Sequence, residues 1–336
     1  MLFSNSFIRA ALGLALICLF LSSGVAEERV ETAVADRLAS QHMQRFPKPW
    51  LMRKSDGEYA WSYTHGLVLL GIEQLYKQNG DEAYADYIQA YADHFITPEG
   101  DIETLKITEF NIDSINAGKM LFFLYGRTGD IRYKKAMDRL REQLEWQPRT
   151  HTEGFWHKRK YPWQIWLDGL YMGQPFYAQY EKSFGDDPAV YDDIVSQFVV
   201  IEQKTHDEET GLLYHAWDES TLMDWADPDT GRSPGFWSRA MGWYAMAIVD
   251  TMEHLPKAHE GREKLTGILN RLVDTLATFQ DETGLWYQVP EQGGREGNWL
   301  EASGSSMFVY AIAKGVRLGM LSDGYLAIAT KGYEGL

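Results

Sequence analysis

The sequence predicts an all-α protein of the (α/α)6 class, in which six helical hairpins close into a toroid. Two observations lead to this prediction: a Gly-Asp step recurs along the chain, and helices of buried character alternate with helices of mixed character. The length of 336 residues, 45% of them hydrophobic, allows a single large domain with a sizeable core. An open α-solenoid is the alternative arrangement of the same hairpins.

A short motif marks the boundary between two helices at four places. Gly80-Asp81-Glu82-Ala83-Tyr84 resembles Gly129-Asp130-Ile131-Arg132-Tyr133, and looser copies begin at Gly185 and Ser322. Glycine favours the left-handed conformation that ends a helix, and aspartate caps the start of the next one. A second repeat, 207–214 against 281–287, predicts two turns that each follow a helix.

Helical periodicity around these marks predicts eleven helices. Those before the glycine steps are apolar nearly all round, as in GLVLLGIEQLY, which is typical of buried helices. Those after the steps are mixed, as in YKKAMDRLREQLEW, which is typical of a half-exposed outer layer. Six hairpins need twelve helices, so we expect the last hairpin to be truncated. The predicted helices cover 29–45, 61–79, 81–96, 112–128, 131–146, 164–183, 188–204, 236–254, 260–280, 302–319 and a segment from about 323.

The sequence of residues 1–26 is typical of a secretory signal peptide. We expect residues 27–336 to form a single domain. Arg9 precedes the apolar run 10–21, and Gly24-Val25-Ala26 offers a cleavage site. The run is short for a membrane span, and an uncleaved N-terminal anchor is the alternative. We therefore expect an exported protein, periplasmic or secreted. Because the single cysteine, Cys18, lies inside this peptide, we expect neither disulfides nor thiolate metal sites.

The charge balance is acidic, with 32 Lys and Arg against 48 Asp and Glu and a net charge of −16. Nucleic acid and anionic membranes bind clustered cations, so we exclude them as main partners. The 12 Trp and 19 Tyr suit sugar binding as well as core packing. The sequence has no HExxH, no phosphate-binding loop and no ligand spacing among its nine His, so we expect no metal and no cofactor.

Polar and aromatic residues recur at the starts of the predicted buried helices. Asp113 and Asp168 lie 16 and 17 residues before the next glycine step. Because the buried helices of such a barrel all run the same way, their starts meet at one mouth. A buried charge is costly unless it is paired or functional, so this mouth predicts a sugar site. The other residues at this level are Tyr63, His65, Trp237, Arg239, Trp243 and Ser303.

These residues also have purely structural interpretations. Asp113 could be a helix cap. Asp168 fits that role less well, because the helical pattern already runs through Ile165 and Trp166. Arg239 could pair with either aspartate in the core. The remaining alternatives are a solvated basic turn for His157 and Lys158, a packed loop for His215, core packing for Trp237 and Trp243, and spare loop carboxylates at Glu153, Asp218 and Glu301.

Five segments carry a family resemblance: WSYTHGLVLLG, FNIDSINAGKML, GFWHKRKYPWQIWLDGLYMG, GLLYHAWDE and GFWSRAMGWYAMAIVD. In this order they resemble the unsaturated rhamnogalacturonyl hydrolases of glycoside hydrolase family 105, relatives of the unsaturated glucuronyl hydrolases of family 88. The resemblance runs from about residue 33 to the C-terminus. It implies an (α/α)6 barrel that removes the 4,5-unsaturated uronic acid from the non-reducing end of lyase-generated oligosaccharides.

The resemblance also implies roles for individual residues. The reaction is hydration of the C4=C5 enol ether, and Asp168 matches the catalytic acid and base. Asp113 matches a second aspartate, whose charge would help to keep Asp168 protonated. Arg239 and Lys158 are expected to bind the uronate carboxylate. The other expected substrate contacts are Tyr63, His65, His157, His215, Trp237 and Trp243.

Two other functions remain open from the residues alone. One is an inverting glycosidase that uses two carboxylates on saturated oligosaccharides. The other is a non-catalytic exported sugar-binding protein. For the favoured function, the expected aglycone is rhamnose from pectin rhamnogalacturonan. Sulfated rhamnose from ulvan and another glucuronate-linked sugar are the alternatives.

Overall fold

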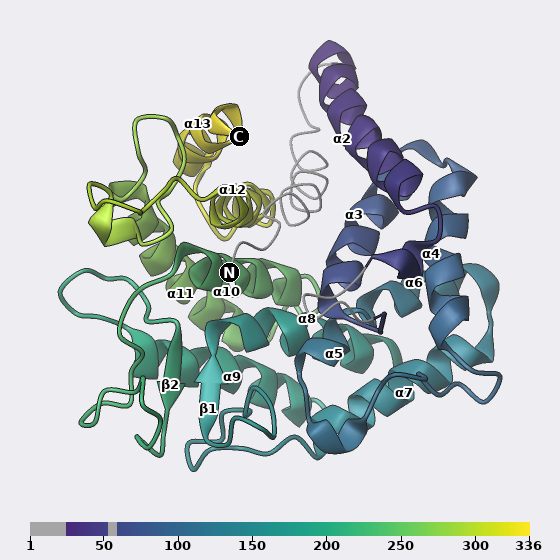
Figure 1. Ribbon diagram of the computed structural model, residues 1–336, viewed down its shortest axis with the longest axis horizontal. Helices are drawn as coiled ribbons and strands as arrows, with labels where there is room; N and C mark the ends of the chain where they lie inside the picture. Colours follow the sequence, from purple (N-terminus) through teal and green to yellow (C-terminus); the bar gives the residue numbers. More distant parts are fainter. Residues whose placement is uncertain (1–24, 53–58) are drawn as a thin grey trace. The chain divides into compact units, whose positions relative to one another are not determined.

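The computed structural model describes residues 25–52 and 59–336, with the backbone alone for 25–33. The described chain is mostly helical (Figure 1), so the predicted all-α class is confirmed. The predicted signal peptide 1–26 lies outside the described residues except for its last two. Within the described ranges, none of the helices combines the length and the apolar character that crossing a membrane requires.

The described chain packs as two compact units. The first unit comprises residues up to 107 together with 113–145, and the second comprises 108–112 and 146–336. The short 3-10 turn η2 (Ile107–Glu109) marks the passage of the chain from one unit to the other.

The first unit is built from helices joined by the predicted capped turns. Gly80 is left-handed, with φ 71°, and the side chain of Asp81 accepts a hydrogen bond from the N–H of Ala83. Gly129, with φ 69°, and Asp130 repeat this arrangement. Both Gly-Asp steps are therefore confirmed as helix boundaries. The elements are α2 (Val25–Arg45), η1 (Pro49–Leu51), α3 (Tyr63–Asn79), α4 (Glu82–Phe95), α5 (Asp113–Asn116), α6 (Lys119–Thr128) and α7 (Ile131–Glu145).

The predicted single helix 112–128 is wrong, because the structure has α5 and α6 with a break at Ala117 and Gly118. At this break α3 approaches very closely. A Cβ atom added to Gly66 would lie 2.6 Å from the Cα atom of Ala117. The predicted helix is thus interrupted where the two backbones come close together. Asp113 is the first residue of the short helix α5 that precedes this interruption.

In the second unit, α10 packs between α8 and α12 (Figure 1). These three helices are buried on nearly every side, whereas α9 packs against α8, α11 against α10 and α13 against α12. The predicted alternation of buried and outer helices is therefore confirmed in this unit. Gly185 departs from its expected left-handed cap, with φ −89°. The elements are α8 (Leu167–Phe184), α9 (Ala189–Thr205), α10 (Ser238–Met252), α11 (Gly261–Thr278), η3 (Pro290–Gln292), α12 (Ala302–Arg317), η4 (Asp323–Tyr325) and α13 (Leu326–Gly335).

A two-stranded antiparallel sheet precedes α8. It pairs β1 (Gln164–Trp166) with β2 (Ala216–Asp218). The prediction that a helix begins at 164 is therefore wrong, because the backbone of these three residues is extended and paired with β2. As a consequence, Asp168 lies in the first turn of α8 rather than inside a running helix.

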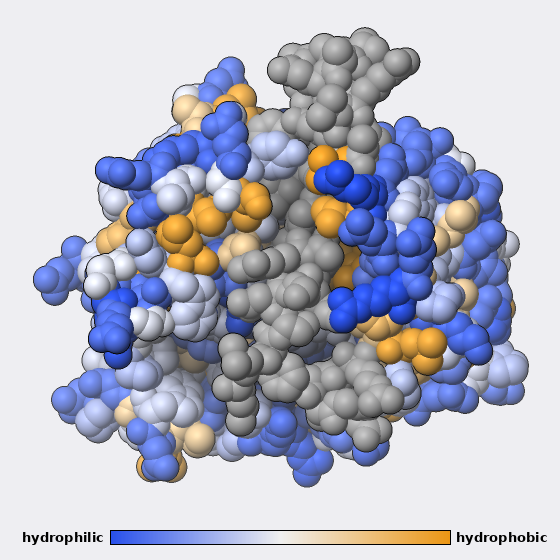
Figure 2. Space-filling view, turned by 45° about the horizontal axis from the view of Figure 1, so that its top comes forward, coloured by the Kyte–Doolittle hydropathy of each residue, from blue (hydrophilic) through white to orange (hydrophobic). Residues whose placement is uncertain are grey.

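The face shown in Figure 2 is mostly hydrophilic, with small and separate hydrophobic patches. Large apolar side chains that are exposed in the described chain include Leu222, Trp146 and Ile131. Scattered apolar residues of this kind are normal on protein surfaces. The polar residues are therefore the better guide to a binding site.

Candidate active site

Asp168 and His215 share a hydrogen bond in the second unit. The Nε2 atom of His215 lies 3.0 Å from the Oδ2 atom of Asp168. The side chain of His215 is 27% exposed and that of Asp168 is 16% exposed, so the pair is partly buried but reachable. One proton makes this bond, with imidazole as donor to carboxylate or carboxylic acid as donor to imidazole. A carboxyl group held in this way can give a proton to a ligand and take one back.

The small sheet brings this pair together from opposite ends of two strands. Trp166, at the end of β1, pairs with Ala216, at the start of β2. One residue further on, the N–H of Leu167 donates to the carbonyl of His215 at 3.1 Å. Antiparallel pairing therefore places the first turn of α8, with Asp168, beside the residue that precedes β2.

Two tryptophan rings enclose His215. Its ring centroid lies 5.5 Å from that of Trp166 and 4.9 Å from that of Trp237, both in edge-on contact. Trp166 also stacks with His157 at 4.4 Å and with Tyr161 at 5.1 Å. Aromatic rings around the hydrogen-bond partner of a carboxyl group give a ligand apolar surface near a proton donor, which suits the mixed character of a sugar.

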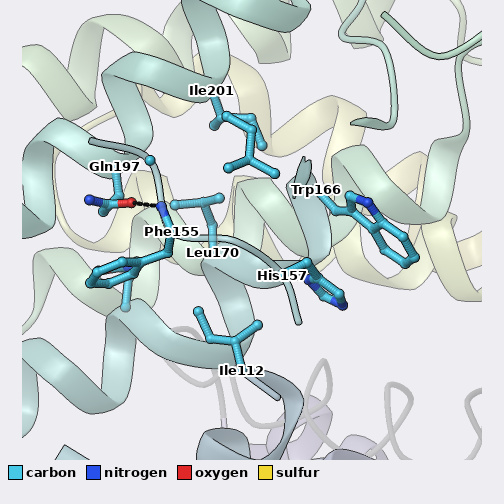
Figure 3. A pocket seen from close by; sticks show the side chains of 11 residues that line it. Ile112, Phe155, His157, Trp166, Leu170, Gln197 and Ile201 are labelled. Atoms are coloured by element: carbon cyan, nitrogen blue, oxygen red, sulfur yellow. Dashed lines mark hydrogen bonds between the residues drawn. The ribbon is translucent and has the colours of Figure 1, made fainter. Parts of the chain in front are cut away.

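A small enclosed pocket borders the first turn of α8 (Figure 3). On one side of it, Gln197 Oε1 accepts a hydrogen bond from the N–H of Phe155 at 2.8 Å. His157, which is only 3% exposed, packs so closely on α8 that a Cβ atom on Gly169 would lie 3.0 Å from its Nδ1 atom. The structure therefore places His157 as a wall residue that supports Trp166 next to Asp168.

Arg239, the second residue of α10, completes the cluster. Its Cζ atom lies 4.2 Å from the ring centroid of Trp237. Its Nη1 atom donates to Glu301 Oε1 at 3.3 Å and to Ser303 Oγ at 3.1 Å. A chain of contacts thus runs from Asp168 through His215 and Trp237 to Arg239.

Glu301 is a residue whose role the sequence did not reveal. It is 1% exposed and caps α12 by accepting hydrogen bonds from the N–H groups of Ser303 and Gly304. Its position directly before a helix could have suggested the capping role. Its ion pair with Arg239 joins residues that are 62 positions apart in the sequence, so residue spacing could not predict it. The ion pair shown for Arg239 is thus with Glu301, not with one of the two aspartates considered above.

Three predicted site residues belong to the first unit. Tyr63 and Asp113 are the first residues of α3 and α5, and both are partly exposed. His65 is 1% exposed, with its Nδ1 atom 2.7 Å from the Oγ atom of Ser62 and its ring stacked on Tyr91. The cluster around Asp168 described above consists of second-unit residues alone.

Trp243 is buried in the core between α8 and α10. It is 2% exposed and its ring centroid lies 4.9 Å from that of Tyr171. Burial, followed by the charge of Asp250, raises the pKa of Tyr171 well above its ordinary value.

Lys314 Nζ contacts Asp250 at 2.7 Å and Glu253 at 2.5 Å. Burial alone would lower the pKa of Lys314, but the two carboxylates outweigh it and the pKa is raised.

Lys158 lies in the loop that follows His157 and is partly exposed. Its backbone forms an isolated bridge with Tyr161, which stacks with Trp166.

Within the part of the chain that the structure describes, no three His, Cys, Asp or Glu side chains are grouped in a way that could hold a metal ion.

The fold and this cluster define an all-α protein with an acid residue set among aromatic rings. Residues 34–336 match the sequence model of Glycosyl Hydrolase Family 88, and the chain belongs to this family. A solved structure of a family 105 glycoside hydrolase from C. acetobutylicum ATCC 824 is similar, with 46% identity and a TM-score of 0.84. The likeness covers 89% of this chain and 81% of that one. It confirms the predicted (α/α)6 class and the family resemblance.

The curated relatives of this chain include the following two proteins. Protein Atu3128 of Agrobacterium fabrum is 40% identical over 150 residues, which are 45% of this chain and 63% of that protein. The match thus spans less than two thirds of that relative. Unsaturated rhamnogalacturonyl hydrolase YesR of Bacillus subtilis is 24% identical over 298 residues, 87% of this chain and 78% of that protein.

Proposed function

We propose that this protein is a glycoside hydrolase that removes the 4,5-unsaturated uronic acid from the non-reducing end of lyase-generated oligosaccharides. The observation that carries the proposal is the hydrogen bond between Asp168 and His215 beside the rings of Trp166 and Trp237. The name of the relative YesR, which aligns with most of this chain, supports this substrate class.

In the proposed reaction, the carboxyl group of Asp168 gives its proton to C4 of the unsaturated sugar. Positive charge develops at C5 and on the ring oxygen. Water then adds to C5, and its proton goes to the carboxylate of Asp168. The hemiketal opens to a ketone at C5, and the hemiacetal left at C1 expels the aglycone. One water molecule is consumed, and Asp168 ends as it began.

The surrounding residues have separate tasks in this proposal. The guanidinium of Arg239, fixed by Glu301, binds the uronate carboxylate, for which its planar shape is suited. Lys158 provides a second cation for the same group. His215 holds the carboxyl of Asp168 in place and accommodates either position of the shared proton. Asp113 is the second carboxylate, whose charge favours the protonated form of Asp168.

A panel of lyase-generated unsaturated disaccharides tests this function. We expect loss of the absorbance of the C4=C5 bond together with release of the second sugar, and among neutral second sugars most rapidly with rhamnose. Hydrolysis of saturated oligosaccharides alone would instead select the inverting glycosidase. Tight binding without turnover would select the sugar-binding protein.

We also propose that the protein is exported, since 1–26 have the layout of a signal peptide. Expression of the full chain followed by N-terminal sequencing of the exported product should give Glu27 as the first residue. A product that starts at Met1 and stays with the membrane would select the uncleaved anchor.

A further inference from the structure

A cationic hollow of about 620 Å³ lies in the second unit. Among the residues that the structure describes, Lys158, Arg159 and Lys160 contribute three positive charges to its lining, against one carboxylate, that of Glu109. The chain as a whole has a net charge of −16. Because a local excess of cations in a concave surface concentrates anions there, the hollow is suited to an anionic ligand in spite of the acidic protein around it. Thr108 and Asn111 are the other described residues that line it.

Hydrogen bonds from backbone and side-chain donors hold the two loops that form this hollow. The N–H of Arg159 donates to the carbonyl of Glu109 at 3.0 Å, and its Nη1 atom donates to the carbonyl of Thr108 at 3.2 Å. Gln147 Nε2 donates to the carbonyl of Phe110 at 2.9 Å. Phe110 has a φ of 43°, in the left-handed region that a phenylalanine rarely adopts. The loops are therefore held in one arrangement, and the cations are placed before any ligand arrives.

Both loops also touch the helix that carries Asp168. The N–H of Ile112 donates to the carbonyl of His157 at 3.2 Å. A Cβ atom on Gly169 would lie 3.0 Å from Nδ1 of His157 and 3.6 Å from Cγ2 of Ile112. His157 directly precedes Lys158, and Gly169 directly follows Asp168. The lining residues Lys158 and Asn111 are therefore the sequence neighbours of His157 and Ile112, whose side chains lie close to the first turn of α8.

We propose that this hollow binds a second anionic group of the substrate, carried by the aglycone side of the oligosaccharide. The inference rests on the proposed function and deepens it. The departing uronic sugar has one carboxylate, for which Arg239 and Lys158 are assigned. Arg159 and Lys160 remain, and they match either the carboxylate of a further uronic acid or a sulfate ester. The preferred substrates are thus unsaturated oligosaccharides with an anionic aglycone.

Three substrates test this inference on the full chain. They are an unsaturated disaccharide with a neutral second sugar, an unsaturated tetrasaccharide with a uronate at the third sugar, and a disaccharide with a sulfate on the second sugar. We expect kcat/KM to be about tenfold or more higher for at least one anionic substrate than for the neutral disaccharide. This advantage should shrink as the salt concentration rises, because salt screens exposed charges. The anionic substrate that gains identifies the carboxylate or the sulfate as the ligand.

The double variant R159Q/K160Q should lose most of this preference. Its control is K257Q/K264Q, which removes two exposed cations elsewhere in the second unit and changes the net charge equally. The control should keep the preference, and thermal melting of both variants reports on folding. Equal kcat/KM for all three substrates in the wild type, or an unchanged preference in R159Q/K160Q, would overturn the inference. Failure to turn over any unsaturated substrate would instead contradict the proposed function.

Discussion

His215 Nε2 lies 3.0 Å from the Oδ2 atom of Asp168, although 47 residues separate them in the chain. The link depends on the pairing of Trp166 with Ala216, which sets the start of α8 beside the residue before β2. The same imidazole contacts Trp237, and Trp237 lies against the guanidinium of Arg239. One histidine therefore joins the proposed acid to the proposed carboxylate-binding group.

Replacement of His215 by phenylalanine should lower kcat by about 100-fold, because it removes the proton-sharing partner of Asp168 while a ring still fills the space near Trp237. KM should change less, and the pH profile of kcat should shift. The control is His206→Phe, since His206 contacts only the exposed Glu208 among the ion pairs shown for it. Equal losses of kcat in the two variants would argue that the hydrogen bond has no catalytic role.

The sequence was sufficient for features that depend on local order. The steps at Gly80 and Gly129 follow from short-range capping, and counting back from Gly185 placed Asp168 near the start of a buried helix, although the predicted start at 164 was three residues too early. It was insufficient for the strand 164–166, because three residues carry too little periodicity and their partner is remote. For the same reason the ion pair of Arg239 with Glu301 could not be predicted.

The variant Glu301→Gln should raise KM about tenfold with a smaller effect on kcat, since the lost charge loosens Arg239 while the amide oxygen can still cap α12. A double-mutant cycle with Arg239→Gln distinguishes an effect on KM that acts through Arg239 from a general structural effect. If Glu301 acts through Arg239, the second substitution should add little to the KM of R239Q. Additive effects, or an unchanged KM in E301Q, would show that the two side chains act independently.

Replacement of Asp113 by asparagine should reduce kcat by about 100-fold, because the substitution removes the charge proposed to favour protonated Asp168. The matched control is Asp130→Asn, which changes a carboxylate that caps α7 through the N–H of Arg132. If Asp113 were only a helix-starting residue, both variants would lose stability and keep their activity. Activity assays and thermal melting of the two variants distinguish these cases.

Lys314→Met should lower the free energy of unfolding by about 3 kcal/mol, because Asp250, whose side chain is only 15% exposed, would lose Lys314, and Glu253 would keep only the more distant contact with Arg317. The control Lys264→Met removes an exposed lysine paired with Glu260 and should change the free energy of unfolding by less than about 1 kcal/mol. The pKa of Lys314 is raised above 10.5 in the folded protein. Its contribution is therefore full below that pH and is lost as the pH rises further. Denaturant titrations at neutral and alkaline pH measure both effects.

The most direct test is the rate at which Asp168→Asn consumes the C4=C5 bond of an unsaturated uronyl disaccharide that the wild type hydrolyses. An amide cannot donate the proton that C4 requires, so we predict a decrease of about 1,000-fold or more, with an unchanged circular dichroism spectrum and melting temperature. Loss of absorbance at the wild-type rate in this folded variant would contradict the assignment of Asp168 as the acid.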